Sequence, residues 1–181
     1  MSTTKRHILD MTYIALGAVL IAAGAWITVP FAAIPFTMQT FSVFAVCLLL
    51  GGKRATVSVL VYIALGAAGV PVFSGFRGGA GVIAGPTGGY IVGFIAVTLA
   101  FWAAEKLFSK KFWPGVAALA VGLALCYLFG TLWYVIVYTG AAEKAGFGYA
   151  LSVCVLPYLP FDAAKLALAA AICPRLAKFI K

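Results

Sequence analysis

Long apolar stretches, separated by short polar, glycine-rich or proline-rich segments, run through almost the whole chain. A helix needs about 20 apolar residues to cross the hydrocarbon core of a bilayer. The pattern predicts membrane-spanning helices at about residues 11–29, 37–50, 55–70, 87–108, 115–139 and 161–174. A further apolar stretch, residues 149–159, is interrupted by Pro157. The expected fold is therefore an all-α, polytopic membrane protein with six transmembrane helices.

Composition favours a single integral membrane domain covering residues 1–181. Of the 181 residues, 65% are hydrophobic and 9% are charged, whereas soluble domains carry about 25% charged residues. We expect no soluble domain beside the helices. The first apolar run follows a basic cluster and is longer than a signal-peptide core, so we expect it to be retained as the first span.

Basic residues gather in the segments between apolar runs, which is typical of the cytoplasmic side of a membrane protein. If both termini are cytoplasmic, that side holds Lys5, Arg6, Lys53, Arg54, Lys106, Lys110, Lys111, Arg175, Lys178 and Lys181. The opposite side then holds only Arg77 and Lys144, with the acid Glu143. The net charge of +9 is therefore better explained by membrane orientation than by nucleic acid binding, and the partner of the helices is lipid.

The cysteines show no spacing typical of a metal or redox site. All four lie far apart within apolar runs, at Cys47, Cys126, Cys154 and Cys173. We expect them to be small buried residues, and we expect neither a metal nor a cofactor.

Two opposite charges, Asp162 and Lys165, follow Pro160 at the head of the last apolar stretch. Spacing i, i+3 places both on one helix face. A charge at the bilayer centre costs about 2.5–3.5 kcal/mol on insertion scales, so such residues usually mark a ligand site, an ion path or a proton relay. The alternative is a structural ion pair at a helix N-terminus, where a carboxylate favours the helix dipole.

With six spans, the pair lies below two irregular outer loops, residues 30–36 and 71–86. Irregular backbone at membrane depth occurs where it is buried in protein or lines a cavity. The sequence therefore predicts a pocket that opens to the outside. Within residues 75–90, the many glycines favour either a binding loop that presents backbone amides or tight packing at helix ends.

Five segments together resemble a known family: residues 35–40 (PFTMQT), 50–54 (LGGKR), 69–73 (GVPVF), 85–94 (GPTGGYIVGF) and 159–165 (LPFDAAK). In this order they resemble the BioY family, the biotin-specific substrate-binding (S) components of energy-coupling-factor (ECF) vitamin transporters. The resemblance covers about residues 12–175. It implies a six-helix protein that binds biotin from outside, with an ECF transmembrane coupling subunit and two ATPase subunits as partners. The late Asp and Lys with which the family contacts biotin match Asp162 and Lys165.

The chemistry of biotin fits these residues. Its ureido ring has N–H donors and a carbonyl acceptor, so Asp162 can accept from an N–H. Lys165 can donate to the carbonyl or keep Asp162 charged. Arg77 is the one cation of the outer loop 71–86 and is expected to hold the biotin carboxylate through a charge-assisted bond. The alternative for Arg77 is a solvated loop charge.

Other pocket residues are predicted from their place beside these loops. The apolar walls are expected to come from Phe36, Phe73, Phe76 and Tyr90. The polar residues Thr37, Gln39 and Thr87 lie at the outer ends of predicted spans, and each either contacts the ligand or caps its helix.

A stripe of small residues, Ala15, Ala18, Ala22 and Ala25, follows one face of the first span. Small faces let helices approach closely in lipid. The stripe resembles the surface with which S components dock on the coupling subunit, and the alternative is packing within the chain.

The expected function is biotin uptake as an S component, with no enzymatic activity in this chain. No Walker motif is present, so ATP hydrolysis is assigned to partner subunits. The one histidine, His7, lies near the N-terminus, which leaves no Ser/His pair or metal site within the membrane. The alternatives are a biotin transporter that acts without ATPase partners and an S component for another small vitamin.

Overall fold

The computed structural model describes residues 3–30, 34–109, 111–138 and 146–180. Several residues used in the charge count lie outside these ranges, namely Lys110, Glu143, Lys144 and Lys181. The same holds for residues 31–33 of the expected outer loop and for residue 139 of the fifth expected span.

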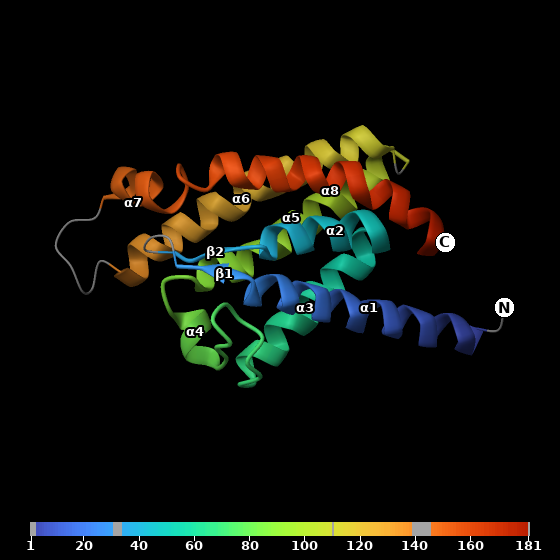
Figure 1. Cartoon of the computed structure of the whole chain (residues 1–181), viewed down its shortest axis with the longest axis horizontal. Helices are drawn as coiled ribbons and strands as arrows, with labels where there is room; N and C mark the ends of the chain where they lie inside the picture. Colours follow the sequence, from blue (N-terminus) through green and yellow to red (C-terminus); the bar gives the residue numbers. More distant parts are fainter. Residues whose placement is uncertain (1–2, 31–33, 110, 139–145, 181) are drawn as a thin grey trace.

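The described chain is mostly helical, and its longer helices lie side by side in an elongated bundle (Figure 1). These are α1 (Thr3–Trp26), α2 (Gln39–Leu50), α3 (Gly52–Ala67), α5 (Gly88–Leu107), α6 (Phe112–Tyr138) and α8 (Leu159–Ile180). Two short helices, α4 (Ala80–Ala84) and α7 (Phe147–Cys154), lie at one end of the bundle with the antiparallel strands β1 (Thr28–Val29) and β2 (Phe36–Thr37). Helix α1 begins and α8 ends at the other end, so both termini share one end (Figure 1).

Length and composition identify three described helices that can cross a membrane: α1, α5 and α6. A fourth span results if α7 and α8, which are bent by 50° at a short break, count as one. Helices α2 and α3 have 12 and 16 residues, or about 18 and 24 Å at 1.5 Å per residue. Both are shorter than a typical hydrocarbon core of about 30 Å. The six expected spans are therefore a proposal that needs its own test.

The turn between α2 and α3 is fixed by packing against α5 at the end that holds the termini. Gly51 adopts a left-handed φ of 84°. The carboxylate of Glu105 accepts the backbone N–H of Gly52 at 2.6 Å, which satisfies one of the N–H groups that a helix start leaves unpaired. A Cβ atom at Gly52 would lie 2.4 Å from the Cα of Trp102, so this position allows only glycine.

The alanine stripe of α1 packs mainly within the chain, and here the predicted docking role needs correction. Ala18, Ala22 and Ala25 are buried in the core, while Ala15 is exposed. The same face carries Gly17 and Gly24, where a Cβ atom would lie 2.4 and 2.2 Å from the hydroxyls of Ser58 and Ser42. Small residues therefore bring α1 close to α2 and α3. The outward face of α1 carries larger side chains instead, including Leu16, Val19 and Leu20.

Two further sequence predictions can be compared with the structure. All four cysteines are free and buried, which confirms their expected role as small apolar residues. The last predicted span ends at residue 174, whereas α8 continues through Pro174 to Ile180.

Candidate functional site

A pocket of about 740 Å³, including its mouth, opens among the elements at the end away from the termini. Ligand sites for small molecules commonly have mainly apolar walls with a few polar groups. Apolar side chains come from several elements, among them Ile34, Phe36, Ile91, Phe94 and Leu123. The pocket therefore joins helices that are far apart in the sequence.

The structure brings all eight predicted substrate-binding residues to the lining of this one pocket: Thr37, Gln39, Phe73, Arg77, Thr87, Tyr90, Asp162 and Lys165. Phe36, a predicted wall residue, also lines it. The sequence did not predict how these residues contact one another.

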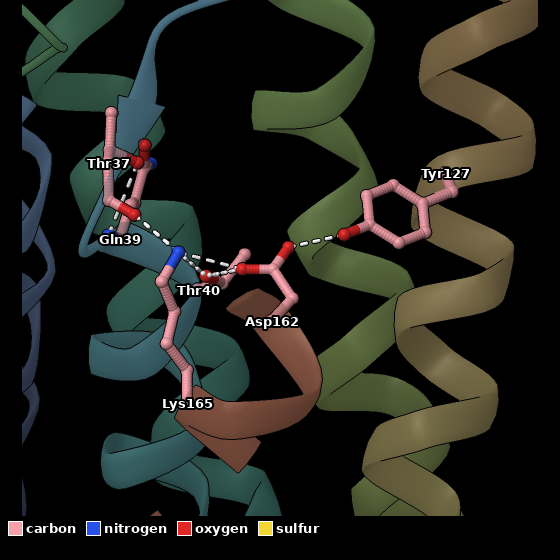
Figure 2. A network of polar contacts seen from close by, with 6 residues as sticks. All are labelled: Thr37, Gln39, Thr40, Tyr127, Asp162 and Lys165. Atoms are coloured by element: carbon pink, nitrogen blue, oxygen red, sulfur yellow. Dashed lines mark hydrogen bonds and ion pairs between the residues drawn. The ribbon is translucent and has the colours of Figure 1, made fainter. Parts of the chain in front are cut away.

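Asp162 and Lys165 form a buried ion pair in the first two turns of α8 (Figure 2). Lys165 Nζ lies 2.7 Å from Asp162 Oδ1, and the two side chains are 7% and 5% exposed. The ammonium also donates to the backbone carbonyl of Thr37 at 2.7 Å and to the hydroxyl of Thr40 at 3.0 Å. It lies 4.0 Å from the centre of the Phe36 ring, within reach of a cation–π interaction.

Two residues that the sequence did not single out hold the Asp162 carboxylate. Thr40 on α2 donates its hydroxyl to Oδ1 at 2.8 Å, and Tyr127 on α6 donates its phenol O–H to Oδ2 (Figure 2). Thr40 closes the PFTMQT segment, which was a usable signal. Tyr127 lies in the middle of an apolar run, and its signal is that a tyrosine removed from water normally finds a hydrogen-bond partner.

The predicted polar residues differ in their contacts. Thr37 accepts the backbone N–H of Gln39 with its hydroxyl at 3.3 Å, and Gln39 is buried with its amide donating to Tyr62 at 2.9 Å. Thr87 lies at the start of α5 but makes no side-chain capping bond there. Tyr90 shares a hydrogen bond of 3.1 Å with the hydroxyl of Thr131. Thr37 therefore accepts the first N–H of α2 from the residue before the N-cap, Met38, and neither α2 nor α5 has a side-chain bond from its N-cap residue.

Phe73 anchors the loop between α3 and α4 to the bundle. Its ring is 1% exposed and packs edge-on against Tyr62, with ring centres 5.5 Å apart. A Cβ atom at Gly66 would lie 2.0 Å from the tip of the Phe73 ring. The absence of a side chain at Gly66 therefore leaves the space that this pocket wall occupies.

Arg77 lines the pocket from the exposed part of the same loop. Its guanidinium donates to the carbonyl of Ser74 at 3.1 Å, and the backbone carbonyl of Arg77 accepts the N–H of Phe73 at 2.9 Å.

Phe76 does not belong to the lining of the pocket, so the prediction that it forms a wall was wrong. It is 64% exposed and stacks on Trp26 with ring centres 5.2 Å apart, because a φ of 56° turns the chain outward here.

The conspicuous glycines at the start of α5 serve close packing. A Cβ atom at Gly88 would lie 1.6 Å from the carbonyl oxygen of Ile83. At Gly89 it would lie 2.3 Å from the Cβ of Trp133. These contacts favour the structural alternative for the GPTGGY segment, which positions Thr87 and Tyr90 at the pocket by holding α5 against α4 and α6.

Together, these features describe the arrangement of the site. A helical bundle with membrane-spanning helices encloses an apolar pocket, and a buried, hydrogen-bonded ion pair forms part of its polar lining. Within the described ranges, His, Cys, Asp and Glu form no group of three that can hold a metal ion. The fold and the site define a multi-pass membrane protein that binds a small molecule within its helices.

Comparison with known proteins gives the family. The model of the BioY family matches residues 1–181, and the chain belongs to this family. It is 41% identical to the biotin transporter BioY of Thermotoga maritima over 161 residues, covering 88% of this chain and 90% of that protein. It is 38% identical to a probable biotin transporter BioY of Pyrococcus horikoshii over 168 residues, covering 92% and 95%.

The fold is similar to a solved structure, the S-component for biotin from an ECF-type ABC transporter. The TM-score is 0.84 at 24% sequence identity, and the match covers 98% of this chain and 95% of the other. The overall arrangement of the helices is therefore that of an S component.

Proposed function

We propose that this chain binds biotin at the external face of the cell membrane and takes it up as the substrate-specific S component of an ECF-type transporter. The observation that carries this proposal is the buried Asp162–Lys165 pair in an apolar pocket of a BioY-family chain. Relatives over most of its length are named biotin transporters, and the fold is that of an S component.

The pocket offers complementary chemistry to each part of biotin. The Asp162 carboxylate, paired with Lys165, can accept a ureido N–H. Phe36 and Phe73 provide apolar surface for the bicyclic ring. Arg77, at the exposed loop, is the cation available to the carboxylate of the tail.

A binding titration tests the site. Calorimetry with detergent-purified protein should show tight biotin binding, and Asp162→Asn should weaken it about 100-fold, because a hydrogen bond to a charged group contributes about 1.5–3 kcal/mol. Asp10→Asn is the matched control, since Asp10 belongs to an ion pair with Arg54 that does not line this pocket. Equal affinities of wild type and Asp162→Asn would reject the site.

The same titration tests the substrate. Wild-type protein that ignores biotin but binds another small vitamin would leave the transporter family unchanged and reject biotin as its ligand.

The proposed orientation has six spans, α1, α2, α3, α5, α6 and α8, with both termini cytoplasmic. It is supported by Lys53, Arg54, Lys106 and Lys111, which belong to turns and helix ends at the end that holds the termini. Because the native cysteines are buried, introduced cysteines can report the side. In intact cells, a membrane-impermeant maleimide should label Phe76→Cys and leave Lys178→Cys unlabelled. The reverse labelling pattern would contradict this orientation.

The proposed partners are the transmembrane coupling subunit and two ATPase subunits. Cells that produce this chain with the ATPase module should accumulate labelled biotin, and cells that produce the chain alone should not. Equal accumulation without the module would favour a transporter that acts by itself.

A further inference from the structure

The Lys165 ammonium has no donor left for a ligand in this structure. An ammonium group offers three N–H donors. The three acceptors within hydrogen-bond distance are the Thr37 carbonyl at 2.7 Å, the Thr40 hydroxyl at 3.0 Å and Asp162 Oδ1 at 2.7 Å. A ligand carbonyl therefore has to break one of these bonds to reach Lys165.

The Thr40 hydroxyl is occupied in the same way. It accepts from Lys165 and donates its one hydrogen to Asp162 Oδ1 at 2.8 Å. Oδ1 then accepts two hydrogen bonds, from Thr40 and from Lys165, which matches the capacity of a carboxylate oxygen. In this structure Lys165 and Thr40 thus pair with Asp162 and orient its carboxylate.

The other carboxylate oxygen differs. Among the described residues, Asp162 Oδ2 accepts one side-chain hydrogen bond, from the Tyr127 phenol, and a carboxylate oxygen can accept two. Both Asp162 and Tyr127 line the pocket. The pocket therefore presents an acceptor, Oδ2, beside a hydroxyl whose hydrogen can rotate to another acceptor.

An acceptor beside a donor complements the N–H and C=O that project from neighbouring atoms of a cyclic urea. We infer that Tyr127 is a specificity-determining residue that recognises the ureido carbonyl by donating a hydrogen bond to it. This inference rests on the proposed binding of biotin. The ureido N–H donates to Asp162 Oδ2, and the Tyr127 O–H turns from Oδ2 to the ureido C=O. The hydrogen bond between Tyr127 and Oδ2 is exchanged for two hydrogen bonds to the ligand, so that Oδ2 and the phenol each gain a new partner.

If Tyr127 donates to the ligand carbonyl, its substitution has an effect that is not expected if Tyr127 only orients Asp162. A hydroxyl that only orients the carboxylate affects every ligand N–H equally. A hydroxyl that donates to the ligand carbonyl discriminates between ligands that differ in the atom at the position of the carbonyl oxygen. Sites built to hydrogen-bond a polar group reject analogues that lack it.

The experiment is a cycle of two proteins and two ligands. Wild type and Tyr127→Phe, purified in detergent, are titrated with biotin and with its thiocarbonyl analogue, in which a weakly accepting sulfur replaces the ureido oxygen. Wild type should bind biotin about tenfold more tightly than the analogue, and Tyr127→Phe should lose most of this preference, because a hydrogen bond contributes about 0.5–1.5 kcal/mol. The cycle cancels the larger size of sulfur, which is present with both proteins.

Tyr149→Phe is the control, because Tyr149 is 59% exposed on α7 and does not line the pocket; it should keep the wild-type preference. An equal loss of affinity for both ligands in Tyr127→Phe would overturn the inference and leave biotin binding intact. If Tyr127→Phe does not fold, the wild-type comparison decides: equal affinities for biotin and the analogue overturn the inference. Wild type that binds neither ligand would reject the proposed function, and the inference with it.

Discussion

Among the described residues, two carboxylate–cation pairs lie in very different surroundings. Asp162 and Lys165 lie 2.7 Å apart with side chains 5% and 7% exposed. At the opposite end of the bundle, Asp10 on α1 accepts from Arg54 on α3 at 2.8 Å, and these side chains are 45% and 38% exposed. Contact distances are alike, so the difference between the pairs lies in what surrounds them.

The buried pair is part of a network that joins three helices and a strand, through Thr40, Tyr127 and the Thr37 carbonyl. The exposed pair joins two helices and remains open to water, with Arg54 also lying over the Tyr13 ring at 5.0 Å. Exposed pairs contribute about 0–1 kcal/mol, whereas removing one partner of a buried pair costs about 3–5 kcal/mol. Loss of one partner is therefore expected to cost more stability at the buried pair than at the exposed pair.

The largest expected effect follows from removing the buried cation. Lys165→Ala leaves the buried Asp162 side chain without its cationic partner, so ligand-free protein in detergent should lose about 3–5 kcal/mol of stability, measured by chemical or thermal unfolding. The double variant Asp162→Asn with Lys165→Met removes both charges and should recover much of that loss without restoring biotin binding. A double variant as unstable as Lys165→Ala would show that the unpaired charge is not the cause.

A smaller effect is expected at Thr40. Thr40→Val removes the donor to Asp162 and the acceptor of Lys165 at nearly constant volume, and should cost about 1–3 kcal/mol in the same unfolding measurement. Thr12→Val is the matched control, because the Thr12 hydroxyl bonds only to a carbonyl within its own exposed helix turn. Similar losses in both variants would remove the distinction between the network and an ordinary surface threonine.

The smallest effect is expected for the exposed pair. Arg54→Ala should cost about 0–1 kcal/mol at low salt, and the difference from wild type should shrink at 1 M salt, where the Debye length is about 3 Å. The loss in Thr40→Val should not depend on salt in this way. A large, salt-independent loss in Arg54→Ala would make the two pairs equivalent.

The sequence predicted the membrane class and eight of the residues that line the pocket for clear physical reasons. Lipid requires long apolar helices, and it makes the one charge pair left among them conspicuous. The resemblance to a family then identified the loops beside that pair.

Contacts between helices were beyond the sequence. Nothing among eight tyrosines indicates that Tyr127 reaches Asp162, because that contact depends on how α6 packs beside α8. In the sequence, the alanine stripe of α1 fits a partner helix or the chain's own helices equally well. The burial of Ala18, Ala22 and Ala25 favours packing within the chain. The prediction that Phe76 forms a pocket wall was wrong, because local backbone angles, not hydrophobicity, direct its ring onto Trp26.

The missing side chain at Gly66 limits how the shape of the pocket can change in evolution. Gly66 lies on α3, outside the pocket lining, yet the Phe73 ring occupies the volume that any side chain at Gly66 would need. Replacing this glycine displaces a wall of the pocket, and a change at Phe73 frees room at Gly66. Substitutions at positions 66 and 73 are therefore expected to covary. The shape of the ligand site thus depends in part on Gly66, a residue that does not line it.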